Sequence, residues 1–478
     1  MRSCAGSSVP EIDLLAINRG AVTAPAGCGK THLIADALAR HSDAKPILVL
    51  THTNSGVAAL RGRLDRAGVP SRAYRLSTID GWALRLLTMF PKRGGHDPQI
   101  LQVSNPAAHY PALRDAAWRL LQAGHLSDVL AATYHRLIVD EYQDCSENQH
   151  AIVLHAAAII PTCVLGDPMQ AIFAFGGNVL PDWSREVCTA FPLVGELETP
   201  WRWINAGEEV FGRYLLDVRH DLVAGRQVDL TRSPPNVHWV QLTGGPGDHE
   251  LRLRAGRTSV AGLDGKVLII ADSRSPQSQR DFAGQTPGAV TVENVDMRDL
   301  VTFGEGLDLT SPNVLHHVVG FASSVMTGVG GATMMQRVTT LREARQRREA
   351  SDAEKAAIAF AEAPSYRRAA DLLVEIGKQS GVRAHRPSIL RGGLKMLETC
   401  GGSENIAPAD AAIRVREMSR LIGRPLAKRT VGSTLLLKGL EADVAVVLDP
   451  AAMDRKHLYV AMTRGAKQLV ICSRTNMI

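Results

Sequence analysis

The chain has 478 residues, of which 45% are hydrophobic and 21% are charged, with a formal net charge of +6 and a pI near 9.0. This length exceeds what one hydrophobic core usually serves, so we expect two principal domains with insertions. The sequence has no apolar run near the roughly 20 residues that span a bilayer, which excludes a membrane-spanning helix. Residues 1–10 lack the pattern of a signal peptide, and we expect a cytoplasmic protein.

Seven cysteines are scattered along the chain without a CxxC pair, and their odd number leaves at least one outside any disulfide scheme. We therefore expect reduced and mostly buried thiols. The positive charge suits a polyanionic partner, although many proteins with this charge bind no nucleic acid.

Short apolar runs rich in β-branched residues predict buried parallel strands in two parts of the chain. In the first part the strands are Ala21–Thr23, Ile47–Thr51 and Leu137–Val139, and the first two are followed by helical patterns at Thr31–Arg40 and Ser55–Arg66. In the second part the predicted strands are Val267–Ala271, Ser433–Leu437, Val444–Leu448 and Leu469–Cys472. Residues 306–424, between the first two of these, show helical periodicity. The order predicts an α/β fold of two parallel-sheet domains, each interrupted by an insertion, with the second insertion mostly helical.

A glycine-rich turn joins the first predicted strand to the first predicted helix. It consists of Ala24, Pro25, Ala26, Gly27, Cys28, Gly29, Lys30 and Thr31. Small residues let backbone N–H groups curl around a phosphate, a lysine supplies charge to the β- and γ-oxygens, and the next hydroxyl can hold Mg²⁺. The turn therefore predicts a site for ATP and Mg²⁺, with Lys30 as a catalytic residue and Thr31 as a metal ligand. An ordinary strand-to-helix turn is the alternative.

Two carboxylates follow the strand predicted at Leu137–Val139. In this position Asp140 can bind Mg²⁺, and Glu141 can polarise the water that attacks the γ-phosphate. An acidic strand end is often only a solvated loop. The phosphate-binding turn upstream favours the catalytic interpretation.

At this point the sequence resembles a known family. The segment Asp140–Asp144 looks like motif II of superfamily 1 DNA helicases of the UvrD/Rep/PcrA type, and other segments resemble the remaining motifs in the family's order. These segments are Pro46–Leu64, Ser77–Leu87, Gly166–Phe175, Leu197–Arg202, Lys438–Glu441 and Leu458–Arg464. The resemblance runs from Ala21 to Arg464, nearly the whole chain.

The resemblance implies two RecA-like domains. The first would comprise residues 1–90 and 131–194, with a small insertion at 91–130. The second would comprise residues 195–305 and 425–478, with the helical insertion at 306–424.

The resemblance also implies roles for single residues. Gln170 would couple the γ-phosphate to the DNA site, and Arg202 and Arg464 would reach the γ-phosphate from the second domain. Trp201 would stack on the base of ATP and Glu441 would lie near the ribose. A core aromatic and a solvated loop acid are the simpler interpretations of the last two.

DNA-contacting positions of the family correspond to Thr53, Asn54, Thr78, Phe173 and Phe175. The two phenylalanines would stack on bases, but buried side chains of a strand-to-loop turn explain them equally well. The arginine-rich run at Arg337–Lys355 also contains acids, and mixed signs usually indicate a solvated helix face.

Several departures from the family pattern affect the DNA contacts. Ile79-Asp80 stands where an aromatic and a histidine are common, and Phe175-Gly176-Gly177 replaces Trp-Arg-Gly. Leu435 and Leu436 replace a histidine and a serine. No glutamine occurs in Glu11–Gly20, where the family has an adenine-binding motif, so adenine selectivity is in doubt. The sequence favours ATP hydrolysis more strongly than processive unwinding.

Together these patterns predict an ATP- and Mg²⁺-dependent translocase or helicase that moves 3′ to 5′ on single-stranded DNA or a tailed duplex. In the alternative, the chain is a DNA-stimulated ATPase that regulates a separate nuclease subunit and unwinds little by itself. Its compact architecture is similar to that of the helicase-like subunit of Gabija-type anti-phage defence systems. A noncatalytic DNA-binding protein would require vestigial phosphate-binding residues. No membrane partner is expected.

Overall fold

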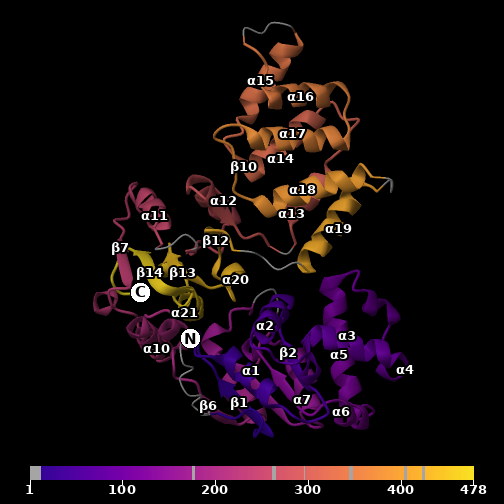
Figure 1. The fold of residues 1–478 in the computed structure, drawn as a ribbon, viewed down its shortest axis with the longest axis vertical. Coiled ribbons are helices and arrows are strands. Elements are labelled where there is room, and N and C mark those ends of the chain that lie inside the picture. Colours follow the sequence, from indigo (N-terminus) through magenta and orange to yellow (C-terminus); the bar gives the residue numbers. More distant parts are fainter. Residues whose placement is uncertain are drawn as a thin grey trace. The chain divides into compact units, whose positions relative to one another are not determined.

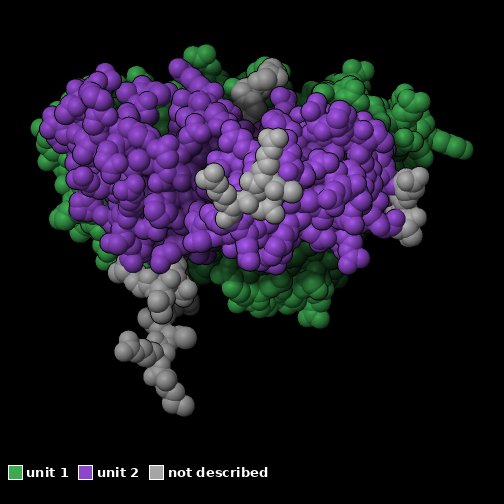
Figure 2. Space-filling model, turned by 90° about the horizontal axis from the view of Figure 1, so that it is seen from above, with its two compact units in different colours: residues 1–237, 453–467, 476–478 green, residues 238–452, 468–475 purple. Residues whose placement is uncertain are grey.

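The computed structural model describes residues 12–174, 178–260, 265–294, 296–343, 348–402, 406–421 and 426–478. The chain forms two compact units, whose elements are labelled in Figure 1 and whose atoms are coloured separately in Figure 2. Unit 1 comprises residues up to 237 with 453–467 and 476–478. Unit 2 comprises residues 238–452 and 468–475.

Unit 1 is built on a six-stranded sheet in which all the strand pairs are parallel. In the order β3-β2-β4-β5-β1-β6, the strands are Tyr74–Thr78, Ile47–Thr51, Leu137–Val139, Thr162–Gly166, Arg19–Thr23 and Leu193–Glu196. Strands β2, β4 and β5 are buried along their whole length. Burial on both faces explains why their sequences are continuous apolar runs.

Unit 1 also contains helices. They are α1 (Lys30–Arg40), α2 (Asn54–Arg66), α3 (Ile79–Met89), α4 (Pro91–Gly94), α5 (Pro106–Gln122), α6 (Ser127–Thr133), α7 (Glu147–Ala156), α8 (Cys188–Ala190), α9 (Trp201–Asn205), α10 (Glu209–Val223) and α21 (Arg455–Met462). Helix α5 packs against α3 and α7. Its Leu113 and Leu120 belong to the same core as Leu48 and Leu137 of the sheet. The region of the predicted small insertion therefore shares its core with the first sheet.

A second six-stranded sheet has the order β7-β14-β13-β8-β12-β9. Its strands are Val237–Gln241, Gly465–Ser473, Ala442–Val447, Val267–Ile270, Arg429–Gly432 and Ala289–Thr291. The pairs β13–β8, β8–β12 and β12–β9 are parallel. Two sheets with parallel strands, each accompanied by helices, confirm the predicted α/β fold class.

The prediction of a strand at Ser433–Leu437 in this sheet is wrong. Strand β12 ends at Gly432, and Thr434–Leu437 form the short helix α20. The Ser433 hydroxyl accepts a hydrogen bond from the Leu436 N–H at 3.3 Å, and a serine in this position starts a helix. Leucine is also a better helix former than the β-branched residues of a typical buried strand.

The rest of unit 2 is mostly helical, as predicted. Its helices are α11 (Asp248–Gly256), α12 (Pro276–Gln285), α13 (Arg298–Glu305), α14 (Val314–Val325), α15 (Gly331–Arg342), α16 (Asp352–Glu362), α17 (Tyr366–Lys378), α18 (Pro387–Cys400) and α19 (Pro408–Leu421), with the small strands β10 (Met326–Thr327) and β11 (Arg383–Ala384). Helices α13 to α19 lie together in Figure 1 and share a core that runs from Met297 to Val415. This core begins shortly before the predicted start of the helical insertion at residue 306.

Six of the cysteines lie among the described residues. All six are free thiols, and all except Cys188 are buried. Burial raises the pKa of Cys28 and of Cys163 to about 12, so both thiols are protonated at neutral pH. This agrees with the expectation of reduced, mostly buried cysteines.

Candidate nucleotide site

The loops after three neighbouring strands meet at one edge of the sheet in unit 1. Strands β4, β5 and β1 are adjacent, with Val139 opposite Val164 and Thr23 opposite Gly166. Because these strands are parallel, their carboxyl ends lie side by side, and open α/β sheets bind ligands outside such ends. The predicted phosphate-binding turn, the two carboxylates and Gln170 follow these three strands.

The turn between β1 and α1 has glycine where the backbone needs it. Gly27 and Gly29 adopt φ angles of 72° and 88°, which favour glycine. A Cβ atom on Gly27 would lie 2.5 Å from the ring of Trp203, and one on Gly29 would lie 2.9 Å from the ring of Trp201. Helix α1 then begins at Lys30 without a side-chain cap on its first N–H groups. Such a helix start favours a phosphate through its N–H groups and its dipole.

Lys30 joins the turn to the carboxylates that follow β4. Its Nζ lies 2.9 Å from Asp140 Oδ1 and also contacts Glu141 Oε1. Burial alone would lower the pKa of Lys30, but the charges of Asp140 and Glu141 outweigh it and raise that pKa. Burial raises the pKa of Asp140, and Lys30 opposes this rise. The three groups form one buried, mutually dependent charge cluster.

The oxygen atoms of Thr31 and Asp140 fit a magnesium ion. Magnesium prefers hard oxygen ligands and usually takes one or two from the protein, with the rest from phosphates and water. Among the described residues, no three or more His, Cys, Asp or Glu side chains form a metal-binding cluster. Magnesium bound mainly through phosphates and water does not need such a cluster. The Thr31 hydroxyl accepts a hydrogen bond from Arg63 Nη1 at 2.7 Å. Arg63 of α2 is therefore in contact with one of the two predicted magnesium ligands.

Glu141 has an unusual backbone. Its φ of 56° lies in the left-handed region, which is costly for a residue other than glycine and is concentrated at functional sites. Its N–H donates to Asp140 Oδ1 at 2.9 Å. The amide of Gln143 donates to Glu141 Oε2 at 2.7 Å. The Glu141 carboxylate is thus held by Lys30 through one oxygen and by Gln143 through the other.

A buried ion-pair network holds Gln170. Its amide donates to Asp167 Oδ2 at 3.1 Å, and Asp167 is 0% exposed. Arg219 of α10 bonds Asp167 Oδ1 at 3.0 Å and Glu196 Oε1 at 2.6 Å. Gln170 is therefore fixed at the carboxyl end of β5 by an arginine from a helix more than forty residues later in the sequence.

Helix α9 brings Arg202 to the turn, and Arg464 lies just after helix α21 in the same unit. The backbone N–H of Arg202 donates to the Gly27 carbonyl at 3.0 Å, and its side chain donates to the Thr463 carbonyl at 2.6 Å. Arg464 is 3% exposed and donates to the Val460 carbonyl at 2.8 Å. Arg202 and Arg464 belong to unit 1 together with Lys30, whereas the sequence prediction assigned both to the second domain.

The residues predicted to contact the base and the ribose of ATP lie in different units. Trp201 of α9 is 46% exposed with its ring beside Gly29, so it is not a core aromatic. Glu441 belongs to unit 2, in the loop between α20 and β13.

The predicted DNA-contacting residues have structural roles of their own. Thr53 caps α2 by accepting from the Gly56 N–H, and Thr78 caps α3 by accepting from the Gly81 N–H. Asn54 is the first residue of α2. The ring of Phe173 packs against His52 with centroids 5.4 Å apart, and Phe175 lies outside the described residues.

Four residues near the site had no assigned role in the sequence prediction: Arg63, Gln143, Arg219 and Tyr459. Arg63, Gln143 and Tyr459 occur inside segments that resemble the family's motifs, so the sequence could have pointed to them. The Tyr459 hydroxyl accepts a hydrogen bond from the Ala26 N–H at 3.1 Å, inside the phosphate-binding turn. The sequence carries no such signal for Arg219, because its contact with Asp167 is purely tertiary.

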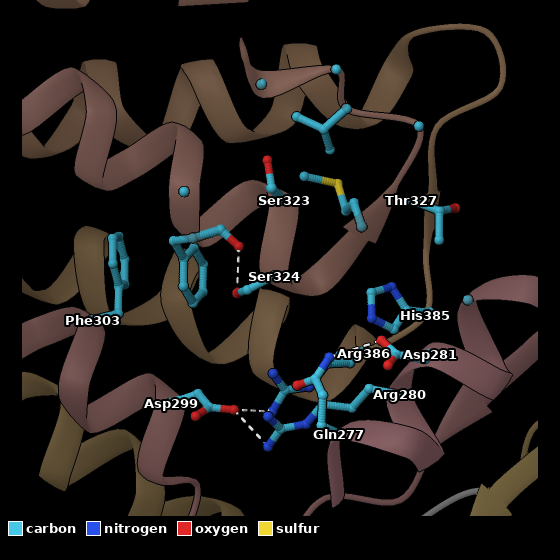
Figure 3. Close-up of a pocket in the computed structure, with 18 of the residues that line it drawn as sticks. Gln277, Arg280, Asp281, Asp299, Phe303, Ser323, Ser324, Thr327, His385 and Arg386 are labelled. Carbon is cyan, nitrogen blue, oxygen red and sulfur yellow. Dashed lines mark hydrogen bonds and ion pairs between the residues drawn. The ribbon is translucent and has the colours of Figure 1, made fainter.

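Unit 2 contains a cavity of about 900 Å³ between α12, α13, α14 and the turn before α15, which Figure 3 shows. None of the predicted site residues is among the described residues that line it. At its floor Arg386 bonds Glu293 and Asp299, and Arg280 also bonds Asp299. The two arginines are thus paired with these two carboxylates.

One family model matches the part of the chain that holds two of the predicted motifs. The model of the UvrD/REP helicase N-terminal domain matches residues 105–181, which include both carboxylates and Gln170. No curated protein matches the chain. One similar solved structure is that of Arterivirus nonstructural protein 10, a helicase, with DNA. It is 13% identical, with a TM-score of 0.29, and the match covers 58% of this chain and 54% of that one. The chain thus spans about half the length of that structure.

Among the described residues, no helix has the length and apolar character needed to cross a membrane. The matched residues include the starts of the loops after β4 and β5, strands that lie beside β1 and the predicted phosphate-binding turn. This match, over residues 105–181, supports a UvrD-like helicase of superfamily 1.

Proposed function

We propose that the chain is an ATP-driven motor on single-stranded DNA that hydrolyses ATP with Mg²⁺ at the loops after β1, β4 and β5. The observation that carries the proposal is the convergence of Lys30, Asp140 and Glu141, with Lys30 Nζ 2.9 Å from Asp140 Oδ1. A lysine at a helix start and two carboxylates at a neighbouring strand end are the parts that phosphoryl transfer needs.

In this proposal Lys30 pairs with the phosphates of ATP instead of with the two carboxylates, and the N–H groups of the turn bind the β-phosphate. Glu141 accepts the proton of the attacking water. Thr31 and Asp140 hold Mg²⁺, which neutralises charge on the phosphates. Gln170 couples the γ-phosphate to the DNA site, and Arg202 and Arg464 stabilise the charge that develops on the transferred group. Trp201 stacks on the base.

The same proposal includes the domains and the DNA contacts. Residues 1–90 and 131–194 form the first RecA-like domain, with 91–130 as its insertion. Residues 195–305 and 425–478 form the second, with 306–424 as its insertion. ATP draws the two domains together and product release lets them part, which moves the protein 3′ to 5′. Glu441 acts near the ribose, and Thr53, Asn54, Thr78, Phe173 and Phe175 contact DNA.

The test combines an ATPase assay with strand displacement. ATP turnover is measured with and without a single-stranded oligonucleotide, and displacement is measured on duplexes with a 3′ or a 5′ tail. We expect DNA-stimulated turnover and displacement only from the 3′-tailed duplex. The absence of any ATP turnover would contradict the proposal.

Turnover without displacement would favour a second function, in which the chain senses DNA and regulates a separate nuclease subunit. The observation that favours it is the replacement of polar DNA-contacting residues by Leu435 and Leu436, which lie in helix α20. In that case DNA cleavage should appear only when the nuclease subunit is added.

A further inference from the structure

The side chain of Gln143 lies between the loops that follow β4 and β5. It is 5% exposed. Its Nε2 donates to Glu141 Oε2 at 2.7 Å and to Asp144 Oδ2 at 3.3 Å, and its Oε1 accepts from the Asp167 N–H at 3.2 Å. One buried amide thus bonds the proposed catalytic carboxylate and the start of the loop that carries Gln170.

The partners of Gln143 fix the orientation of its amide. A carboxylate only accepts hydrogen bonds and a backbone N–H only donates, so the NH₂ group must face Glu141 and Asp144 while the oxygen faces Asp167. The backbone makes room for this arrangement. A Cβ atom on Gly166 would lie 2.7 Å from Gln143 Oε1, so a larger residue at the end of β5 would displace the amide.

Gln143 stabilises the position of the Glu141 carboxylate through a hydrogen bond from an uncharged group. Lys30 contacts the other carboxylate oxygen of Glu141, but in the proposed reaction Lys30 turns to the phosphates. Gln143 carries no charge that a phosphate would attract, so its bond to Oε2 can persist. This bond also holds the side chain of a residue whose φ of 56° leaves its backbone strained.

The bonds of Gln143 continue toward Gln170. The Asp167 N–H donates to Gln143 Oε1, and Asp167 Oδ2 accepts a hydrogen bond from Gln170 Nε2 at 3.1 Å. Resting on the function proposed above, we propose that Gln143 is a positioning residue, which aims the Glu141 carboxylate at the attacking water and ties it to the loop carrying Gln170.

Two substitutions test this role through the kinetics of ATP turnover. Gln143→Met keeps the length but removes the donor, so the Glu141 carboxylate loses its hydrogen bond at Oε2. We expect kcat to fall about 10- to 100-fold while KM for ATP stays within about threefold, because the carboxylate is misplaced and the ATP contacts remain.

Gln143→Glu should behave differently. While the introduced carboxyl is protonated, it can donate to Glu141 as the amide does; once it loses its proton, two like charges face each other. We therefore expect a new decline of kcat with rising pH, in a range where the parent protein is constant.

Gln149 provides a matched control. It is 0% exposed, its Nε2 donates to a carboxylate (Asp80 Oδ1, 2.9 Å), and its Oε1 accepts from a backbone N–H (Ser146, 3.0 Å). The same two substitutions there should lower the thermal midpoint but leave the pH limits of turnover in place.

The outcomes separate the inference from the function on which it rests. A parent protein without ATP turnover overturns both. The positioning role alone is overturned if the parent is active and Gln143→Met loses no more of kcat than Gln149→Met does. It is also overturned if Gln143→Glu keeps the parent's pH profile.

Discussion

The Lys30 ammonium group lies against two carboxylates, and this arrangement dominates the site at the scale of single residues. Nζ is 2.9 Å from Asp140 Oδ1 and also contacts Glu141. The two acids are adjacent in sequence, but their surroundings differ. Asp140 is 7% exposed and ends a buried strand, whereas Glu141 starts the next turn with a strained φ. A metal ligand and a general base need this kind of difference.

Glu141→Gln should still bind ATP and DNA but should hydrolyse ATP at least about a hundredfold more slowly, because no carboxylate remains to accept the proton of water. Steady-state turnover and nucleotide binding check this. Glu147→Gln is the control, since Glu147 is an exposed residue of the first turn of α7. Undiminished turnover in Glu141→Gln would remove Glu141 from the role.

Arg464→Ala should leave ATP affinity within about tenfold of the parent but lower kcat at least about a hundredfold, since such arginines act mainly on the transition state. Stimulation by single-stranded DNA should be lost as well. Arg455→Ala, at the exposed start of the same helix α21, should change little. If Arg464→Ala retains DNA-stimulated turnover, Thr463 and Arg464 are only a structural part of that helix end.

At the scale of elements, α10 is fastened to the loop after β5 by one buried arginine. The side chains of Arg219 and Asp167 are 6% and 1% exposed, so each depends on the other for compensation of its charge. Breaking such a pair from one side leaves an unpaired buried charge. The position of Gln170 depends on this loop, so stability and turnover are linked here.

Arg219→Met should lower the free energy of unfolding by about 3–5 kcal/mol, because Asp167 then stays buried without a counter-charge. Arg213→Met on the same helix breaks an exposed pair with Glu209 and should cost less than about 1 kcal/mol. Urea unfolding of the three proteins measures both effects. Equal effects of the two substitutions would show that Asp167 does not need Arg219.

The sequence predicted those parts of the fold and the site that depend on local pattern. The β1 and β4 strands, the turn at Gly27 to Lys30 and the carboxylates after β4 follow from apolar runs and spacing. The strand predicted at Ser433–Leu437 failed because a short apolar run does not distinguish a strand from a helix, and the cap at Ser433 decided it.

Long-range pairings could not be predicted from the sequence. Asp80 stands where the family commonly has a histidine, and the structure pairs it with Arg114 at 2.6 Å and with Gln149 at 2.9 Å. These bonds join α3, α5 and α7. Arg219 and Asp167 likewise meet only through the fold. Such pairs leave no periodic signal, because each partner lies on a different element.

At the scale of the whole molecule, pH should affect stability through buried histidines. Burial, with the nearby charges of Arg386 and Arg383, lowers the pKa of His385 from 6.5 to about 4. The unfolded chain therefore binds a proton between about pH 6.5 and 4 where the folded chain does not. The stability contributed by neutral His385 is present above pH 6.5 and is lost as the pH falls toward 4.

His385→Asn should reduce this acid sensitivity. Thermal midpoints are compared at pH 7.5 and pH 4.5 for the parent and the variant. Burial also lowers the pKa of His135, His150 and His155, so both proteins should lose stability in acid. The parent should lose more than the variant, and equal losses would show that His385 titrates normally in the folded chain.

The central claim is that the chain hydrolyses ATP at Lys30 and that single-stranded DNA stimulates this reaction. Steady-state ATPase rates with and without an oligonucleotide test it in the parent, in Lys30→Met and in Lys45→Met, whose lysine is exposed and bonds the Ala131 carbonyl. We predict DNA-stimulated turnover in the parent and in Lys45→Met, with at least about a hundredfold loss in Lys30→Met. Turnover that survives in Lys30→Met, or that DNA leaves unchanged in the parent, would contradict the account.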